Sequence, residues 1–353
     1  MTDLQGETAV VASDVVKTFF TLDRQQGFLG GLRTLVMPRR RAKTAVDRMS
    51  LTVRYGELVA LLGPNGAGKS TTIKLLTGIL APTAGSVQVG GIDPHRHREQ
   101  NARGIGAVFG QRTQLWWDLP ARESLAILRD IFEVDESDYR KRLTEYDDLL
   151  QLSEFWDTRV RHLSLGQRVR CDLAAALLHD PMIVFLDEPT IGMDVVVKEQ
   201  VREFLRHQVE RRGRAVLLTT HDMTEVDRLA ERVVLINQGR LAFDGSLEEL
   251  RHRYGETWQV HITFAEPQDR PTVEGLTLVR WDGARAVYGP GPVGGAGPED
   301  NPQNALKRVI EQYAITDVAI TKSDLEDVMR AAYLRAPSSG GNADENRTEV
   351  VAG

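Results

Sequence analysis

A glycine-rich stretch, Gly63–Ser70 with the sequence GPNGAGKS, constrains the fold of this chain more than any other feature. The apolar run Leu58–Leu62 precedes it, and an amphipathic run that begins at Ile73 follows it. This order of strand, glycine loop and helix lets backbone N–H groups and a helix N-terminus bind phosphate. An ordinary strand-to-helix turn is the alternative, and only the downstream sequence can exclude it. The residues expected around a nucleoside triphosphate are Gly63, Pro64, Asn65, Gly66, Ala67, Gly68, Lys69, Ser70 and Thr71.

Within this loop, two side chains have the chemistry that a triphosphate needs. We expect the Lys69 ammonium to reach the β- and γ-phosphates and the Ser70 hydroxyl to hold Mg²⁺. The same pattern therefore predicts ATP or a related nucleotide and a magnesium ion as cofactors.

The composition limits the class of protein. With 353 residues, of which 41% are hydrophobic, the chain can form one large α/β core and a smaller domain. A net charge of -6 argues against nucleic-acid binding. The single cysteine, Cys171, favours a reducing compartment and a buried thiol. No apolar run approaches the roughly 20 residues of a membrane span, and the acidic start does not resemble a secretory signal, so we expect a cytosolic or peripheral protein.

A second chemical element is the run Met182–Glu188, MIVFLDE, which is apolar until its last two residues. Such a run predicts a buried parallel strand that delivers acids to the ligand edge of the sheet. Asp187 can hold Mg²⁺ through water, and Glu188, which points in a different direction, can act as the general base for an attacking water. The next strand, Ala215–Thr219, ends near His221, which places a histidine at the same edge.

A third element is the helix start Leu163–Gln167, LSLGQ, in which Ser164 is the natural N-cap. With Gly166 it forms a second candidate anion site, although an ordinary capped helix has the same pattern. The strand Ile105–Gln111 ends on a polar residue at the ligand edge, and the following Leu115–Trp117 places three large apolar side chains in a loop, which indicates a protein contact.

Near the N-terminus, two features remain open to two interpretations. Phe19, at the end of a strand that begins at Ala9, can stack on an adenine ring or lie in the core. Residues 24–43 combine apolar positions at helical spacing with Arg39, Arg40, Arg41 and Lys43, which suits an anionic membrane surface, a partner helix or a solvated insertion.

The C-terminal third has a different composition. Residues 255–335 predict a small α+β domain, in which Trp258, Val260, Ile262 and Phe264 alternate along one strand face. A further helix is expected where Ser323 and Glu326 form a capping pattern. Residues 336–353 are polar and are expected to be disordered.

Taken together, these motifs resemble the ATP-binding subunit of an ABC transporter, over about residues 10–250. The resemblance rests on GPNGAGKS, Gln111, LSLGQ, MIVFLDE, Asp194 and His221 in this order, with Gln167 placed 20 residues before Asp187. It implies a P-loop NTPase core with a mixed sheet and a helical subdomain at about 112–180. Leu165, where the family commonly has glycine, and Phe19, where a tyrosine often stacks on adenine, are departures that do not argue against activity.

The resemblance also implies roles for single residues. Gln111 would be the Q-loop residue that links Mg²⁺ to a membrane subunit, Asp194 would belong to the D-loop, and His221 would be the switch histidine on the γ-phosphate. Ser164, Gly166 and Gln167 would contact ATP held by another copy, because the chain has one phosphate loop and one LSLGQ start.

The expected assembly is therefore a head-to-tail dimer with a second copy or a paralogous ATPase, bound to integral membrane permease subunits at the cytoplasmic face of the membrane. Within the family, the loop from Gln111 to Trp117, the charged insertion and the tail domain resemble ABC-2 exporters, which include drug and antibiotic extrusion systems. An importer ATPase with a regulatory tail is the alternative. A soluble ABC ATPase that acts on ribosomes or DNA is less favoured, since the chain has neither a second cassette nor a long coiled-coil insertion.

Overall fold

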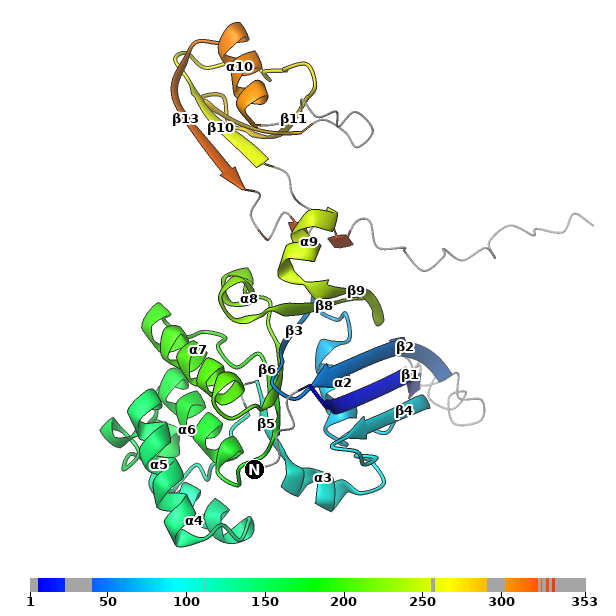
Figure 1. Ribbon diagram of the computed structural model, residues 1–353, viewed down its shortest axis with the longest axis vertical. Helices are drawn as coiled ribbons and strands as arrows, with labels where there is room; N and C mark the ends of the chain where they lie inside the picture. Colours follow the sequence, from blue (N-terminus) through cyan, green and yellow to red (C-terminus); the bar gives the residue numbers. More distant parts are fainter. Residues whose placement is uncertain are drawn as a thin grey trace, which may run out of the picture. The chain divides into compact units, whose positions relative to one another are not determined.

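The computed structural model describes residues 6–22, 40–110, 112–254, 258–290 and 302–322, together with Leu325, Val328, Met329, Ala332 and Tyr333 (Figure 1). The chain divides into two compact units. The first comprises Met1–Leu247 with Ala336–Gly353, and the second comprises Glu248–Arg335. Every chemical motif found in the sequence belongs to the first unit.

The centre of the first unit is a six-stranded sheet with the strand order β5-β6-β7-β3-β8-β9. The first five strands are parallel, and β9 pairs with β8 in the antiparallel sense. Because the carboxyl ends of parallel strands meet at one edge, the sheet gathers the segments that follow β3, β5, β6 and β7. The strands are β3 (Leu58–Leu62), β5 (Ile105–Phe109), β6 (Ile183–Asp187), β7 (Ala215–Thr219), β8 (Arg232–Asn237) and β9 (Arg240–Ser246).

A three-stranded antiparallel sheet lies beside this one, with β1 (Thr8–Leu22) between β2 (Arg40–Arg54) and β4 (Ala84–Val89) (Figure 1). A single buried apolar cluster joins the two sheets to the helix after the phosphate loop. Its fully buried members include Val15, Met49, Leu61, Ile73 and Phe185. The phosphate loop is therefore anchored between both sheets.

Within the described residues, the helices of the first unit are α2 (Lys69–Leu76), α3 (Arg98–Gly104), α4 (Ala121–Ile131), α5 (Glu136–Leu150), α6 (Leu165–Leu177), α7 (Val195–Glu210) and α8 (Met223–Leu229). Two short 3₁₀ turns, η1 (Leu152–Glu154) and η2 (Val160–His162), precede α6. Helices α4, α5 and α6 form a group of their own, drawn in green tones in Figure 1, and α5 also packs on α7. None of the helices within the described ranges has both the length and the apolar composition that crossing a bilayer requires.

The second unit contains a four-stranded antiparallel sheet with the order β11-β12-β10-β13. Helix α10 covers one face of this sheet, where Val260, Ile262 and Tyr288 are buried together with Val309 of the helix. The alternation predicted along β10 is confirmed, since Val260, Ile262 and Phe264 are buried and Trp258 packs at the edge of their cluster. The elements that the structure describes in this unit are α9 (Leu247–Tyr254), β10 (Trp258–Phe264), β11 (Leu276–Trp281), β12 (Arg285–Pro290), α10 (Pro302–Gln312) and β13 (Ile315–Lys322).

Several predicted features differ from the structure or lie outside the described residues. Strand β2 begins at Arg40, four residues before the predicted start at Thr44, because its first residues pair with the end of β1, as Lys43 does with Phe19. Arg40, Arg41 and Lys43 therefore belong to a strand. The rest of the predicted insertion, Gln111, the helix start at Ser323 and the tail 336–353 lie outside the described residues.

Candidate functional site

The phosphate loop joins β3 to α2 at the carboxyl edge of the central sheet. Gly66 and Gly68 have φ angles of 82° and 113°, which residues with a side chain rarely adopt. A Cβ atom on Gly63 would lie 2.5 Å from the carbonyl oxygen of Ile236. Gly68 caps α2 without a side-chain hydrogen bond. The loop therefore needs its glycines, and it leaves the first turn of α2 uncovered by any capping side chain, as an anion site requires.

Lys69 is buried in this loop, with 6% of its surface exposed. Its Nζ donates a hydrogen bond to the carbonyl oxygen of Gly63 at 2.6 Å. Burial lowers the pKa of Lys69, and the carboxylates of Glu188 and Asp187 oppose this effect. The ammonium group is thus partly desolvated between backbone carbonyls and two acids, and phosphate oxygens are stronger acceptors that can replace the carbonyls.

Asp187 ends β6 and connects the phosphate loop to β7. Its Oδ1 accepts hydrogen bonds from the Ser70 hydroxyl at 3.1 Å and from the Thr219 hydroxyl at 2.7 Å. A hydroxyl and a carboxylate at this separation are hard oxygen donors of the type that Mg²⁺ binds together with phosphate oxygens. Ser70 and Asp187 therefore have the chemistry and the proximity of a magnesium site.

Glu188 follows Asp187 with a φ of 52°, a left-handed conformation that costs about 1–2 kcal/mol for a residue with a side chain. Its backbone N–H donates to both the carbonyl and the hydroxyl oxygen of Thr219, each at 3.0 Å, which fixes this conformation. Its Oε1 lies 3.4 Å from Nδ1 of His221. The Glu188 carboxylate therefore lies beside the histidine, the arrangement expected of a general base and its partner.

A cavity of about 290 Å³ opens over the phosphate loop. Its lining combines the whole loop from Pro64 to Thr71 with Glu188, Phe19 and Lys43. Phe19 is 36% exposed, and the Lys17 ammonium lies 5.3 Å from the centre of its ring. Phe19 is therefore a partly exposed ring in the lining of the phosphate-loop cavity.

The LSLGQ helix start begins α6, and the predicted N-cap role of Ser164 is confirmed. Ser164 caps α6, its Oγ accepts from the N–H of Gln167, and the Gln167 side chain accepts from the N–H of Ser164, which completes a capping box. A Cβ on Gly166 would lie 3.2 Å from Val197, so the helix start packs closely on α7. Asp194 caps α7 through the N–H of Val197. Among the described residues, none of this helix start or of the α7 cap lines the phosphate-loop cavity.

The loop Leu115–Trp117 differs from its prediction in one residue. Leu115 is buried at 3% exposure, because the polypeptide folds back onto α6 and α4 there, whereas Trp116 and Trp117 are 39% and 52% exposed. The predicted contact surface is therefore a pair of tryptophans instead of three apolar side chains.

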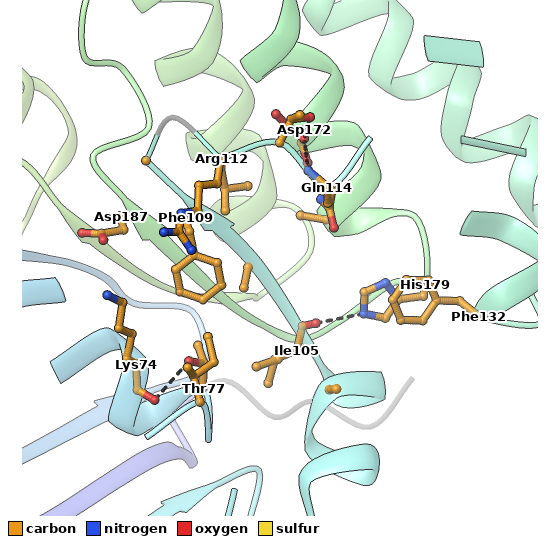
Figure 2. A pocket seen from close by; sticks show the side chains of 17 residues that line it. Lys74, Thr77, Ile105, Phe109, Arg112, Gln114, Phe132, Asp172, His179 and Asp187 are labelled. Atoms are coloured by element: carbon orange, nitrogen blue, oxygen red, sulfur yellow. Dashed lines mark hydrogen bonds between the residues drawn. The ribbon is translucent and has the colours of Figure 1, made fainter. Parts of the chain in front are cut away.

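A second and larger cavity, of about 700 Å³, lies between β5, the end of α2 and helix α6 (Figure 2). Asp172 and Gln114 line one part of it. In another part, the Phe132 ring stacks on the His179 ring, with the two ring centres 4.0 Å apart. The His179 Nε2 donates a hydrogen bond to the carbonyl oxygen of Ile105 at 3.0 Å, as Figure 2 shows. Asp187 lines this cavity while Glu188 lines the smaller one, so two adjacent acids face two separate spaces.

Some site residues were not found by the sequence reasoning. Thr219, which binds both Asp187 and the Glu188 backbone, has one sequence signal, its place at the carboxyl end of β7. Lys43 reaches the phosphate-loop cavity only because β2 pairs with β1 up to Leu22. The contacts of Arg168 and Asp172 on α6 depend on tertiary packing and have no sequence signal.

Comparison with known proteins identifies the family. A sequence model described as ABC transporter matches residues 46–191. The ABC transporter ATP-binding protein NatA of Bacillus subtilis (strain 168) is 32% identical over 212 residues, which cover 60% of this chain and 86% of NatA. The chain belongs to the ABC transporter family of ATP-binding proteins.

Other ABC proteins match over a similar region. The Nod factor export ATP-binding protein I of Paraburkholderia xenovorans (strain LB400) is 39% identical over 204 residues, 58% of this chain and 66% of that protein. A probable sulfate/thiosulfate import ATP-binding protein CysA of Chlorella vulgaris is 37% identical over 206 residues, 58% of this chain and 86% of that protein. The chain matches only about a quarter (26%) of the length of the ABC transporter A family member 1 of Dictyostelium discoideum, at 35% identity over 66% of this chain.

Solved ABC cassettes have the same fold. A dimeric ATP-binding cassette in a post-hydrolysis state bound to ADP and Pi aligns with a TM-score of 0.56 at 27% identity, covering 67% of this chain and 98% of that one. The predicted fold class, an ABC ATPase core with a mixed sheet and helices, is therefore confirmed.

Proposed function

We propose that this chain is the ATP-hydrolysing subunit of an ABC exporter and that it works as a head-to-tail pair, with a second copy or a paralogous ATPase, at the cytoplasmic face of a membrane. The observation that supports this most directly is the division of its phosphate-binding groups. Lys69, Ser70 and Glu188 lie around one cavity, whereas Ser164 and Gly166 at the start of α6 lie outside its described lining. A second chain is needed to bring the two groups together on one nucleotide.

Within one copy, the residues divide the work of hydrolysis. Lys69 and the loop N–H groups hold the phosphates, and Phe19 stacks on the base. Ser70 and Asp187, with Gln111, would hold Mg²⁺, which supplies positive charge beside the phosphate oxygens. Glu188 accepts the proton of the attacking water, and His221, 3.4 Å from it, orients the carboxylate and contacts the γ-phosphate.

The partner copy completes the site through α6. The Oγ of Ser164 already accepts from Gln167, so its hydroxyl hydrogen is available to donate to a phosphate oxygen of the opposing nucleotide. Gly166 has no side chain to obstruct that approach. The capping box holds Gln167 and the N-cap backbone in place, and Asp194 borders the same interface through its cap on α7.

The exposed Trp116 and Trp117 are the proposed contact with an integral membrane subunit, since adjacent exposed tryptophans are typical of protein interfaces. Export is favoured by the similarity to a Nod factor export ATP-binding protein and by the ABC-2-like loop and tail domain. The importer alternative is represented by the CysA relative. Two neighbouring genes for integral membrane proteins would support export, and a neighbouring gene for a secreted binding protein would contradict it.

The test is the substitution Glu188→Gln in the full chain. It keeps the size of the side chain but removes the base, so we expect ATP binding to persist while turnover falls by about a hundredfold or more. The variant should also accumulate as an ATP-dependent dimer, measured by size-exclusion chromatography with bound nucleotide. Glu203→Gln, which changes an exposed acid on α7, is the control. Hydrolysis by Glu188→Gln at the rate of this control would contradict the proposal.

A further inference from the structure

Helix α6 holds the segment that leads to the exposed tryptophans at two points. We call residues Thr113–Trp117 the 113–117 segment. Arg168 and Asp172 are four residues apart on α6 and therefore lie on the same face of the helix. Asp172 contacts the beginning of the 113–117 segment, and Arg168 contacts its end.

The contact at Asp172 is a set of hydrogen bonds. Its Oδ1 accepts from the Thr113 hydroxyl at 2.8 Å and from the Gln114 backbone N–H at 3.0 Å. The Gln114 side-chain amide donates back to the Asp172 carbonyl oxygen at 3.0 Å (Figure 2). Asp172 is only 3% exposed, and burial raises its pKa to about 6, while the Thr113 and Gln114 hydrogen bonds and the Arg168 charge oppose that shift. A buried acid is unfavourable in a helix interior unless it has hydrogen-bond partners. The 113–117 segment supplies these partners to Asp172.

The contact at Arg168 is a cation–π interaction. The guanidinium carbon lies 5.3 Å from the centre of the Trp117 ring. Arg168 immediately follows Gln167 of the capping box, so the residue that contacts Trp117 is the neighbour of the residues proposed to meet the opposing nucleotide.

The attachment of the chain changes between residues 110 and 113. The backbone N–H of Gly110 donates to the carbonyl oxygen of Asp187 at 2.7 Å, which ties it to β6. From Thr113 onward the segment is tied to the helical group instead, through Asp172, through the bond from the Trp116 N–H to the buried Ser124 hydroxyl at 3.1 Å, and through the bond from the Arg161 N–H to the Trp117 carbonyl at 3.1 Å. A displacement of α6 relative to the sheet therefore carries the segment with it.

We propose that Arg168 and Asp172 are positioning residues that make the 113–117 segment move with α6, so that nucleotide contact at Ser164 reorients Trp116 and Trp117 on the surface offered to a membrane subunit. This inference rests on the proposed function, because it requires ATP to engage the start of α6. Under this proposal, Arg168 and Asp172, on consecutive turns of α6, connect the nucleotide to the surface offered to the partner.

The experiment follows the Trp116 side chain in full-length Glu188→Gln protein labelled with 5-fluorotryptophan. The chain has five tryptophans, and their ¹⁹F resonances are assigned by single Trp→Phe substitutions. We expect saturating ATP to shift the Trp116 resonance in this parent. The double substitution Thr113→Val and Trp117→Leu removes the Thr113 hydroxyl that bonds to Asp172 and the ring that contacts Arg168. It leaves α6 and the two Gln114 hydrogen bonds intact, so we expect it to reduce the shift without abolishing it.

Two further variants separate this effect from a general loss of packing. Thr113→Val with Trp117→Tyr restores a ring over Arg168 and should recover part of the shift. Trp156→Leu is the matched control, because it removes an indole whose ring centre lies 5.1 Å from the Arg122 guanidinium carbon in the same helical group. This variant should leave the shift unchanged. ATP retention is measured on every sample.

A complementary measurement is hydrogen exchange of a peptide that spans the 113–117 segment. Asp172→Ala should accelerate exchange about tenfold or more, because it removes the carboxylate that accepts from Thr113 and Gln114. Asp172→Asn, which keeps an acceptor oxygen, should accelerate it less. The inference is overturned if the parent retains ATP without a shift of Trp116, or if the double variant shifts as fully as the parent. Failure of the parent to retain ATP would instead overturn the proposed function, and the inference with it.

Discussion

The Ser70 hydroxyl donates a hydrogen bond to the Asp187 carboxylate at 3.1 Å, although 117 residues separate the two along the chain. The parallel pairing of β6 with β7 and of β7 with β3 aligns the end of β6, which carries Asp187, with the end of β3. The phosphate loop leads from that end of β3 to Ser70 at the start of α2. The candidate magnesium site is therefore a product of sheet order, and side chains that hold these strand ends determine its geometry.

Thr219 is the first such side chain to test. Replacing Thr219 by Val removes the hydroxyl that donates to Asp187 and accepts from the Glu188 N–H. We expect the Mg²⁺ concentration for half-maximal ATPase activity to rise about tenfold, because residues that orient metal ligands typically contribute 10–100-fold.

The control for this prediction is Thr220→Val. It removes a neighbouring buried hydroxyl that bonds to Glu225 and to the Asp222 N–H. It should lower thermal stability without changing the Mg²⁺ dependence. Equal Mg²⁺ dependence in wild-type and Thr219→Val protein would show that Thr219 does not orient the site.

The composite site predicts complementation between two inactive copies. Lys69→Ala loses the phosphate grip, and Ser164→Arg places a bulky cation at the helix start, so each homodimer should lose almost all activity. In a mixed dimer, one interface joins an intact phosphate loop to an intact LSLGQ start, and this interface should trap nucleotide. Trapping and hydrolysis are measured together, since coupled sites can bind without turning over. A Ser164→Arg homodimer that hydrolyses ATP normally would exclude α6 from catalysis.

The exposed tryptophans predict where the membrane subunits bind. Replacing Trp116 and Trp117 together by Ser should lower co-purification with the membrane subunits by more than about tenfold. Tryptophans that become buried when two proteins bind contribute strongly to the affinity of the interface. Trp156→Ser is the matched control in the same helical group. Co-purification unchanged relative to this control would place the docking surface elsewhere.

His179 predicts a dependence of stability on pH. Burial lowers the pKa of His179 to about 4, from a value near 6.5 in the unfolded chain. Between these values the unfolded state binds the additional proton, so the free energy of unfolding falls as the pH drops from 6.5 to 4. The Nδ1 atom is buried without a hydrogen-bond partner, so a charged ring would also leave an N–H unpaired.

Replacing His179 by Phe keeps the stacking on Phe132 and removes the ionisation. We expect a smaller decrease in the urea midpoint between pH 7 and pH 5 than in wild type. His162→Phe changes an exposed histidine and serves as the control. Asp172 acts in the opposite sense, since its raised pKa makes unfolding harder as the pH falls from 6 toward 3.8, and it is unchanged in both variants.

The sequence predicted the parts of the site that depend on local pattern. The apolar runs before Gly63 and through Leu186 identify buried parallel strands, and the placement of Asp187 at a strand end follows from the ligand edge of such a sheet. The N-cap role of Ser164 was also predicted, whereas the reciprocal bond from the Ser164 N–H to the Gln167 side chain is a finding of the structure.

The remaining parts depend on which elements pack together. The left-handed φ of Glu188 results from the bonds between its N–H and Thr219 of a neighbouring strand. The burial of Leu115 and the contacts of Arg168 and Asp172 require the 113–117 segment to fold back on α6. The place of Lys43 depends on how far β1 and β2 remain paired. None of these has a periodicity or a motif within its own stretch of chain.

Two adjacent acids at the end of β6 line separate cavities. Glu188 lines the cavity of the phosphate loop, and Asp187 lines the larger cavity beside α6. Substitutions on the far side of that larger cavity, at Phe132 or His179, can accumulate without altering a residue that touches the phosphate loop. Side chains on that side can therefore vary while the residues around the phosphate-loop cavity stay the same. Lineages that share this cassette should therefore differ most along the α6 cavity and least at the strand end that both spaces share.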